Sequence, residues 1–530
     1  MNSDGVPYLD VSDTYLNGTW RSAFNAYWSP GYPALIAAVR KVIGEGPAND
    51  YPAAHLTVFL LFLVAFGALE FLMGTLMARD ASSATADMDR RHALFLALGY
   101  SLFLWCALAL ITFDMITPDM GVAACVFVAA ALAVRIASAE ASLWIAVVLG
   151  MSLGLGYLVK AVMFPVSVGL LALVIVTAVV RRRALWQAGI ALAVFLAIST
   201  PQVISVSRAK GSFTFSESGK LVHGWYVDGV PCPLWATTTA CLGPVGGAEL
   251  SRVHSGLPYP RMHRNPAVFA FGAQTEGTYP AWYDATFWYH DLHTLIQPRR
   301  QVVVLANNLA EDWTLVFPLA VALVAFLLLS GRRKRWRAVV SEVAPNWLLV
   351  LTAVGVVGMY AFVYTEPRYT GPFVVLLALG LCASTSATAT NLTKALLAAA
   401  VLLAAQASVI ALRDAWWERG ADNPNLVIAD ELHRMGVPAG STLGVIGNGY
   451  VASFWARPAR VRVTSEIYPS EATEFWSADT QTQRDVIDAF RRTGAQAVVA
   501  MDPPAWASLD GWVPVRKSDG LMLLRLQGRP

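Results

Sequence analysis

Most of the chain consists of apolar stretches of about 20 residues, separated by short polar turns or by a few long polar segments. A transmembrane helix needs about 20 predominantly apolar residues to cross the hydrocarbon core of a bilayer. The pattern therefore predicts about ten membrane-spanning helices, of which the ninth is the shortest. The predicted spans are 53–78, 92–113, 118–136, 142–159, 161–180, 184–205, 313–330, 346–365, 369–383 and 392–412.

Three long polar segments interrupt the apolar pattern, at 1–52, 206–312 and 413–530, and they separate predicted helices one to six (53–205) from seven to ten (313–412). The last segment has helical spacing at 426–435 and 483–492 and strand-like apolar runs at 442–446, 495–501 and 521–526. The predicted fold class is therefore an all-α polytopic membrane protein with a large loop at 206–312 and a small C-terminal α/β domain at 413–530.

The composition agrees with a chain that faces lipid. Hydrophobic residues make up 56% of the 530 residues and charged residues 14%, with 18 Trp and 17 Tyr. A soluble chain of this length would carry about a quarter charged residues. The mean hydropathy of +0.50 points the same way. A soluble globular protein is therefore excluded, and many aromatic residues are available to anchor two membrane interfaces.

Lys and Arg residues in the short loops fall on one side of the predicted bundle. Cytoplasmic loops carry an excess of Lys and Arg, so we assign this side to the cytoplasm. The three polar segments then lie outside, on the periplasmic side of a bacterial inner membrane. The residues that define the cytoplasmic side are Arg79, Arg90, Arg91, Arg135, Arg181, Arg182, Arg183, Arg332, Arg333, Lys334, Arg335 and Arg337.

The first segment lacks the features of a signal peptide. Met1 is followed by Asn2, Ser3 and Asp4, without a basic region or an apolar run. An external first segment with no preceding span is unusual for this topology. We therefore expect a further helix upstream of Met1, which would bring the number of spans to eleven.

The acids of the first segment are candidates for chemistry. The amphipathic stretch 33–42 suits a helix lying in the membrane interface. Such a helix would place Asp4, Asp10 and Asp13 near the headgroup layer. The alternative is a solvated loop that carries ordinary surface acids.

Charged residues also stand in short external loops, where cations are otherwise avoided. Asp119 begins the third predicted span, Lys160 separates the fourth from the fifth, and Glu366, Arg368 and Tyr369 precede the ninth. Lys160 and Arg368 would suit an anionic phosphate at the outer leaflet. The alternatives are a helix cap for Asp119 and interfacial snorkelling for the cations.

The 206–312 segment is rich in aromatic residues, including Trp282 and Tyr283. Such rings stack on the apolar faces of sugars, but they equally pack a loop onto a membrane. His290, His293 and Asp284 are candidate ligands for a divalent metal ion, although they lack the i, i+4 helical spacing of a strong metal motif.

Two cysteines of the same segment, Cys232 and Cys241, are a candidate disulfide if the loop faces an oxidising compartment. A reduced pair is the equal alternative, because nearness in sequence does not establish the geometry of a disulfide.

The first-segment motifs Asp4-Gly5-x-x-Tyr8 and Tyr27-Trp28-Ser29-Pro30-Gly31-Tyr32-Pro33 resemble the start of GT-C superfamily glycosyltransferases. The most similar branch is the protein mannosyltransferase and aminoarabinose (lipid A) transferase group. Thr117-Pro118-Asp119, Leu158-Val159-Lys160 and Glu366-x-Arg368-Tyr369 fall where that group places similar short motifs. The order of the motifs, their common side and the number of spans extend the resemblance over the whole chain, except for the family's usual first helix.

The resemblance implies both a reaction and site residues. It makes Asp4 the catalytic carboxylate, with Asp119 as a second outer-face acid, and it implies sugar transfer from a polyprenyl-phosphate donor to a glycan, lipid or protein. A carboxylate would take the acceptor's proton in a single inverting displacement, while cations or a metal stabilise the leaving phosphate. The expected substrate-binding residues are Lys160, Arg368, Tyr369, Glu366, Tyr8, Trp28, Tyr32, Trp282 and Tyr283.

Two other functions fit a polytopic chain. A transporter or flippase of a lipid-linked substrate usually shows repeat symmetry, broken helices and charges near the midplane, whereas the polar residues here gather on one face. A catalytically inactive scaffold with an external binding domain is the other alternative. We expect no nucleotide cofactor, because the glycines of 447–450 lack the spacing of a nucleotide fingerprint, and no nucleic-acid partner.

Overall fold

The computed structural model describes residues 4–79, 86–138, 140, 142–182, 184–230, 260–271, 277–289, 291–329, 344–383, 387–420 and 422–526. The chain divides into two compact units, each of which is described by itself. Unit 1 comprises Met1–Thr57, Ser216–Gln297 and Gly420–Pro530, and unit 2 comprises Val58–Phe215 and Pro298–Arg419.

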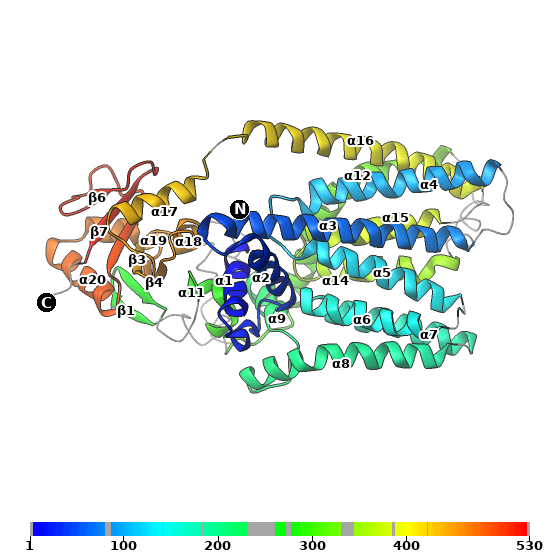
Figure 1. Cartoon of the computed structure of the whole chain (residues 1–530), viewed down its shortest axis with the longest axis horizontal. Helices are drawn as coiled ribbons and strands as arrows, with labels where there is room; N and C mark the ends of the chain where they lie inside the picture. Colours follow the sequence, from blue (N-terminus) through cyan, green and yellow to red (C-terminus); the bar gives the residue numbers. More distant parts are fainter. Residues whose placement is uncertain are drawn as a thin grey trace. The chain divides into compact units, whose positions relative to one another are not determined.

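Unit 2 consists of long apolar helices (Figure 1). Each of the ten predicted spans coincides with a helix over most of its described length, which confirms the helical part of the predicted fold class. The helices are α3 (Pro47–Ala78, from residue 58 onward), α4 (Ala86–Trp105) with the π-helix η2 (Cys106–Ile111), α5 (Asp119–Ala137), α6 (Leu143–Val159), α7 (Met163–Arg181), α8 (Leu185–Lys210), α12 (Pro298–Leu329), the short 3₁₀ helix η7 (Ala344–Asn346), α14 (Trp347–Ala361), α15 (Pro367–Cys382) and α16 (Ala387–Trp417).

Six helices in the described part of the chain are long and apolar enough to cross a membrane, judged by length and composition. Three more apolar helices, α6, α14 and α15, are shorter. These helices are those of a multi-pass membrane protein, while the count of ten crossings stays a prediction. The six are Pro47–Ala78, Met88–Ile111, Asp119–Ala137, Met163–Arg181, Leu185–Lys210 and Thr390–Trp417.

The helices of unit 2 differ in how much apolar surface they expose. The apolar window of α5 is 78% buried, whereas those of α8 and α16 are each 28% buried. Leu196 of α8 and Leu402 of α16 expose 45% and 72% of their surface. A helix that is apolar on every face is either buried in protein or placed in lipid, so α5 belongs to the protein core and α8 and α16 have the surface of lipid-facing helices.

Two glycines set the spacing between α6 and α8. A Cβ atom on Gly150 would collide with the carbonyl oxygen of Ala191 and would lie 2.7 Å from Cβ of Val194. A Cβ atom on Gly154 would lie 2.7 Å from Cβ of Ile198. Glycines four residues apart lie on one helix face and let two backbones approach closely, so this pair fixes the contact between α6 and α8.

Unit 1 contains a seven-stranded mixed sheet with the order β1-β2-β4-β3-β5-β7-β6. The three central strands are parallel, and β2 and β7 pair antiparallel with β4 and β5. The strands are β1 (Arg261–Arg264), β2 (Ala267–Ala270), β3 (Thr442–Ile446), β4 (Arg462–Ile467), β5 (Ala497–Met501), β6 (Val513–Pro514) and β7 (Leu521–Arg525).

The sheet extends beyond the segment 413–530. Strands β1 and β2 come from the 206–312 segment, and Val268 of β2 is buried in the same core as Ile446, Ile467 and Phe490. The predicted strands coincide with β3, β5 and β7, and the predicted helices with α17 and α20. Strand β4 and helices α18 and α19 were not predicted.

The helices of unit 1 complete the fold around the first segment and the sheet. Among them, α2 coincides with the amphipathic stretch predicted at 33–42. They are α1 (Gly5–Leu16), η1 (Trp20–Ala23), α2 (Gly31–Ile43), α9 (Ser218–His223), η3 (Gly224–Asp228), α11 (Pro280–Tyr283), η6 (Ala285–Phe287), α17 (Pro424–Arg434), α18 (Gly449–Ala456), α19 (Pro469–Ser477) and α20 (Thr480–Arg492), together with the start of α3.

Candidate functional site

Five of the predicted site residues form one cluster in unit 2, which we name the Lys160 cluster: Asp119, Lys160, Glu366, Arg368 and Tyr369. Asp119 is the first residue of α5, and Lys160 follows the last residue of α6 in an extended conformation. The other three residues lie at the start of α15. Each residue therefore stands at a helix end, where the chain passes from apolar to polar sequence.

The ammonium group of Lys160 is at the centre of the cluster. Its Nζ lies 2.5 Å from Oδ1 of Asp119 and 3.9 Å from the ring centroid of Tyr369. Cζ of Arg368 lies 5.1 Å from the same ring centroid. Two cations thus share one aromatic ring, an arrangement that is attractive for each cation but brings two positive charges together.

Carboxylates offset these positive charges. Arg368 donates to Glu366, which also accepts a hydrogen bond of 2.7 Å from the hydroxyl of Tyr364. The ring of Tyr360 stacks on that of Tyr369 with centroids 5.2 Å apart. The cluster holds two acids and two bases, so its formal charge is zero before any ligand binds.

Asp119 keeps one carboxylate oxygen available. Its side chain is 2% exposed, and Oδ2 has no hydrogen-bond partner among the residues that the structure describes. Oγ1 of Thr117 is likewise buried without a described partner. A buried carboxylate oxygen without a donor is costly, so this atom is suited to accept a hydrogen bond or a proton from a ligand.

Burial also acts on Lys160. It lowers the pKa of the ammonium group, and the Asp119 carboxylate opposes this effect without cancelling it. An additional anion at this position would favour the charged form.

The predicted cytoplasmic arginines that the structure describes lie at the other helix ends of unit 2, and they are Arg79, Arg90, Arg91, Arg135, Arg181 and Arg182. Arg183, Arg332, Arg333, Lys334, Arg335 and Arg337 lie outside the described residues. Arg135 stands in the last turn of α5, 16 residues beyond Asp119, which corresponds to about 24 Å along a helix. Arg181 donates to the carbonyl of Ala137 at the end of α5, and the guanidinium of Arg135 lies 5.8 Å from the ring of Phe71 in α3. We name this side the arginine end.

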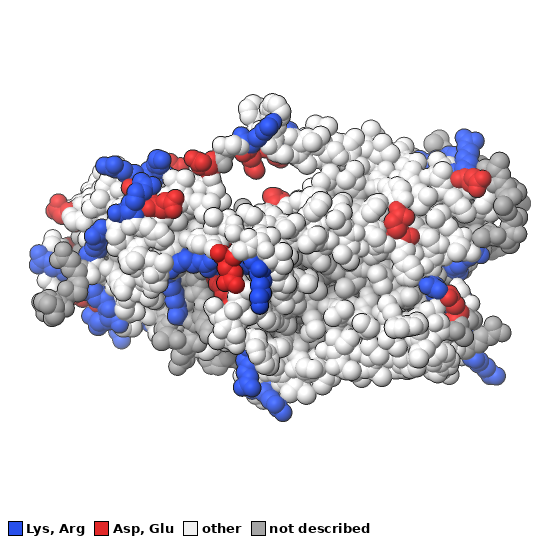
Figure 2. Space-filling view, in the orientation of Figure 1, with Lys and Arg blue, Asp and Glu red and all other residues white. Residues whose placement is uncertain are grey.

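The surface of unit 2 reflects this arrangement. Figure 2 shows a broad, nearly uncharged band across its helices, with Lys, Arg, Asp and Glu gathered toward the helix ends. The separation of the Lys160 cluster from the arginine end agrees with the predicted topology. The assignment of the arginine end to the cytoplasm stays a prediction.

Asp4, the other predicted catalytic acid, belongs to unit 1. It is the N-cap residue of α1, is partly exposed, and its carbonyl accepts a hydrogen bond of 3.4 Å from the amide of Tyr8. Its catalytic role stays a prediction.

Apart from Tyr369, the five aromatic residues predicted to bind substrate are packed in the core of unit 1. Their exposed fractions range from 0% to 6%. The ring of Tyr8 lies 4.8 Å from that of Trp28, whose ring is 5.4 Å from that of Trp282. Tyr32 contacts Tyr8, and Tyr283 donates to the carbonyl of Ser22. These rings join α1 to the 279–283 segment, and their contact with substrate stays a prediction.

An ion network of unit 1 was missed by the sequence analysis. Arg457, 3% exposed, lies 2.6 Å from Asp10 and 2.9 Å from Asp50, and it also pairs with Asp13. Arg40 contacts Asp13 and Asp50 at 2.7 and 2.8 Å. We name Asp10, Asp13, Arg40, Asp50, Arg457 and the partly exposed Arg460 the Arg457 network.

For Asp10, the network excludes the alternative of an ordinary solvated surface acid. Asp10 is buried and accepts two hydrogen bonds of 2.8 Å from Thr278. Burial opposes the charge on Arg457, but the three aspartates raise the pKa of its guanidinium well above the ordinary value. Burial alone would raise the pKa of Asp13, yet Arg457 and Arg40 lower it. These acids therefore hold α1, α3 and α18 together.

Glu466 of β4 is a second buried acid that the sequence did not indicate. It accepts hydrogen bonds from the hydroxyl of Tyr279 at 2.8 Å and from the amide of Gly449 at 3.0 Å. Burial raises its pKa to about 8 despite these donors. Glu466 is therefore largely protonated at neutral pH.

The described residues contain no group of three or more His, Cys, Asp or Glu side chains that would hold a metal ion. Asp284 instead caps the short helix η6 by accepting from the amide and hydroxyl of Thr286 at 3.0 and 2.6 Å. His293 is described, whereas His290 and the candidate disulfide residues Cys232 and Cys241 lie outside the described residues.

Comparison with known proteins finds a structural neighbour. No family model matches the chain, and no curated protein matches its sequence. The chain is similar to ArnT from Cupriavidus metallidurans in the apo state, with 16% identity over 99% of this chain and 93% of that chain and a TM-score of 0.41. A likeness at this level does not assign a family, so membership of the GT-C superfamily stays a prediction from the sequence motifs.

Proposed function

We propose that this chain is a membrane glycosyltransferase that moves a sugar from a polyprenyl-phosphate donor to a glycan, lipid or protein acceptor on the extracytoplasmic face. The observation that carries the proposal is the Lys160 cluster, in which two cations and a carboxylate with an available oxygen meet at the ends of apolar helices. A donor held in the bilayer by its polyprenyl chain would present its phosphate at such helix ends.

Lys160 and Arg368 would bind the donor phosphate. Arg368 supplies a planar guanidinium and Lys160 a compact ammonium, and both suit phosphate oxygens. Both groups contact Tyr369, which fixes their separation. Their charge would stabilise the negative charge that develops on the phosphate as it leaves the sugar.

A carboxylate would act as the base. In a single displacement, the acceptor oxygen or nitrogen forms a bond to the anomeric carbon while the bond from that carbon to the phosphate oxygen breaks. The electron pair of the broken bond leaves with the phosphate, the acceptor's proton passes to the carboxylate, and the anomeric centre is inverted. Asp4 is the first candidate for this base from the family motif, and Asp119 is the second because its Oδ2 is available.

The proposal is tested by label transfer with the full chain in lipid nanodiscs. Membrane lipid extract containing labelled polyprenyl-phosphate sugars supplies the donor and the acceptors, and the readout is label in glycan, lipid or protein. The variants are Asp4→Asn and Asp119→Asn, and Asp414→Asn is the control because Asp414 is exposed. Transfer that is lost in either site variant and kept in the control would support the proposal.

Two outcomes would contradict the proposal. Transfer that is equal in the wild type and both site variants would remove both acids from the mechanism. Flipping of the donor across the bilayer without any transfer would establish the transporter or flippase instead.

A further inference from the structure

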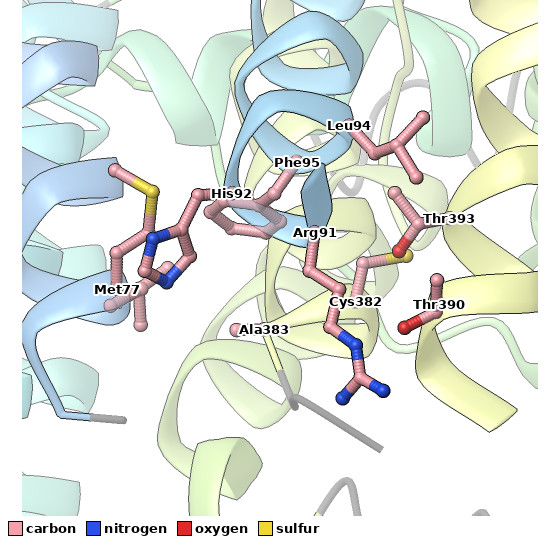
Figure 3. Close-up of a pocket in the computed structure, with 10 residues that line it drawn as sticks. Met77, Arg91, His92, Leu94, Phe95, Cys382, Ala383, Thr390 and Thr393 are labelled. Carbon is pink, nitrogen blue, oxygen red and sulfur yellow. The ribbon is translucent and has the colours of Figure 1, made fainter. Parts of the chain in front are cut away.

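A pocket opens at the arginine end of unit 2, away from the Lys160 cluster (Figure 3). Cys382, which lines the pocket, and Arg368 of the Lys160 cluster stand 14 residues apart on α15, or about 21 Å along the helix. The lining residues are Leu76, Met77, Arg91, His92, Leu94, Phe95, Cys382, Ala383, Thr390 and Thr393.

The polar part of the pocket is suited to an anion. Figure 3 shows the Arg91 side chain extending toward Thr390, with Thr393 and Cys382 on the same side and His92 on the opposite side, near Met77. None of the lining residues that the structure describes is acidic. Nε2 of His92 is buried and has no partner in the described part of the chain. A guanidinium, an imidazole and two hydroxyl groups therefore line one cavity.

The rest of the lining is apolar, with Leu76 and Met77 from the end of α3 and Leu94 and Phe95 from α4. A small soluble anion would gain nothing from these side chains. A lipid would place its phosphate against Arg91 and its glycerol and first methylene groups against the apolar wall. The helices that form the pocket, α3, α4 and α16, are also long and apolar enough to span a bilayer, so the pocket lies at the level where lipid headgroups are found.

We propose that this pocket binds the phosphate headgroup of an anionic phospholipid of the surrounding membrane. Basic pockets between transmembrane helices bind such headgroups through charge-assisted hydrogen bonds. The bound lipid would bridge α4 and α16, because Arg91 belongs to the first helix and Thr390 and Thr393 belong to the second. This site is independent of the proposed sugar transfer and is tested without measuring that activity.

The experiment measures binding of fluorescent phosphatidylglycerol to the full chain in nanodiscs of phosphatidylcholine. Arg91→Gln removes the guanidinium, and Arg91→Lys keeps the positive charge. Arg90→Gln is the matched control, because Arg90 is the preceding residue, is exposed and does not line the pocket. We expect Arg91→Gln to weaken lipid binding by roughly tenfold or more, as for loss of a hydrogen bond to a charged group.

Arg91→Lys should retain more binding than Arg91→Gln, and Arg90→Gln should stay within about twofold of the wild type, as expected for an exposed charge. Equal binding by Arg91→Gln and Arg90→Gln would overturn the proposal. Displacement of the lipid by millimolar inorganic phosphate would also overturn it, by assigning the pocket to a soluble anion. If Arg91→Gln unfolds, a Thr390→Val variant with unchanged lipid binding would exclude the site equally well.

Discussion

Lys160 and Asp119 form an ion pair of 2.5 Å although 41 residues separate them in the sequence. The pair forms because α5 begins at Asp119, α6 ends next to Lys160, and the two consecutive helices pack against each other. A buried pair is stable only when its remaining polar atoms are satisfied. Since Oδ2 of Asp119 has no described partner, the pair is incomplete until a ligand or a proton reaches it.

Replacing Lys160 by Gln should therefore impair the proposed transfer reaction. We expect kcat/KM for the labelled polyprenyl-phosphate donor to fall by about ten- to hundredfold, because a charge-assisted hydrogen bond to the phosphate is lost. Lys160→Arg should recover part of the activity, and Lys220→Gln, which alters a partly exposed pair in unit 1, should have little effect. Initial rates of label transfer, measured over a range of donor concentrations, give kcat/KM for each variant. Equal values for Lys160→Gln and Lys220→Gln would remove Lys160 from the donor site.

Replacing Arg457 by Gln should strongly destabilise unit 1. The substitution leaves three aspartates in a buried region with less positive charge, and breaking a buried ion pair costs about 3–5 kcal/mol. Arg491 pairs with the exposed Asp488, so Arg491→Gln should cost less than about 1 kcal/mol. Thermal unfolding of the full chain compares the two variants, and similar losses in Tm would show that the Arg457 network contributes no more than a surface pair.

The sequence predicts the helices of unit 2 well because apolar length is a local property. Lys160, Arg368 and Asp119 were singled out as charges at the ends of apolar stretches, and the structure brings all three into one cluster. In contrast, Arg457 reaches Asp10 and Asp50 across 447 and 407 residues. No pattern within a window of the sequence indicates such partners.

Strand β4 was missed for a different reason. Its sequence, Arg462 to Ile467, contains Thr464, Ser465 and Glu466 and reads as polar, yet most of the strand is buried. The polar side chains are accommodated because each finds a partner, as Ser465 does with Thr493 at 2.8 Å. Strand propensity and polarity thus conflict at β4, and tertiary contacts decide the outcome.

The buried acid of β4 should make unit 1 sensitive to pH. Glu466 has a pKa of about 8 in the folded chain, against an ordinary value of 4.5. Between these values the folded state binds more protons than the unfolded state, so stability falls as pH rises. The difference between these two pKa values corresponds to up to about 5 kcal/mol in the free energy of unfolding. Glu466→Gln should remove this dependence, because an amide does not titrate.

Hydrogen exchange of the β3 and β4 amides between pH 6 and pH 9, corrected for the intrinsic exchange rate, measures the effect. The wild type should lose protection across this range, while the Gln variant should not. Asp502→Asn is a control, because Asp502 is exposed and lies after β5. A wild type and a Glu466→Gln variant with the same pH dependence would show that another group is responsible.

A methyl group added at Gly150 should destabilise the folded chain, whereas one added at Gly169 should not. Alanine favours helix over glycine by about 1 kcal/mol, and a Cβ atom on Gly169 of α7 would meet nothing within 4 Å. Gly169→Ala should therefore be neutral or slightly stabilising. At Gly150 the methyl group would strike the Ala191 carbonyl and the Val194 side chain, and overpacking costs about 1–3 kcal/mol.

We therefore expect Gly150→Ala to lower the Tm of the full chain while Gly169→Ala leaves it unchanged or raises it. The same difference should appear as weaker protection of α6 and α8 from hydrogen exchange in the Gly150 variant. The informative result is a change in Tm of opposite sign at the two glycines, because helix propensity alone predicts a rise in Tm at both. Stabilisation by Gly150→Ala would mean that α6 and α8 have room for the methyl group and that the close contact between them is absent.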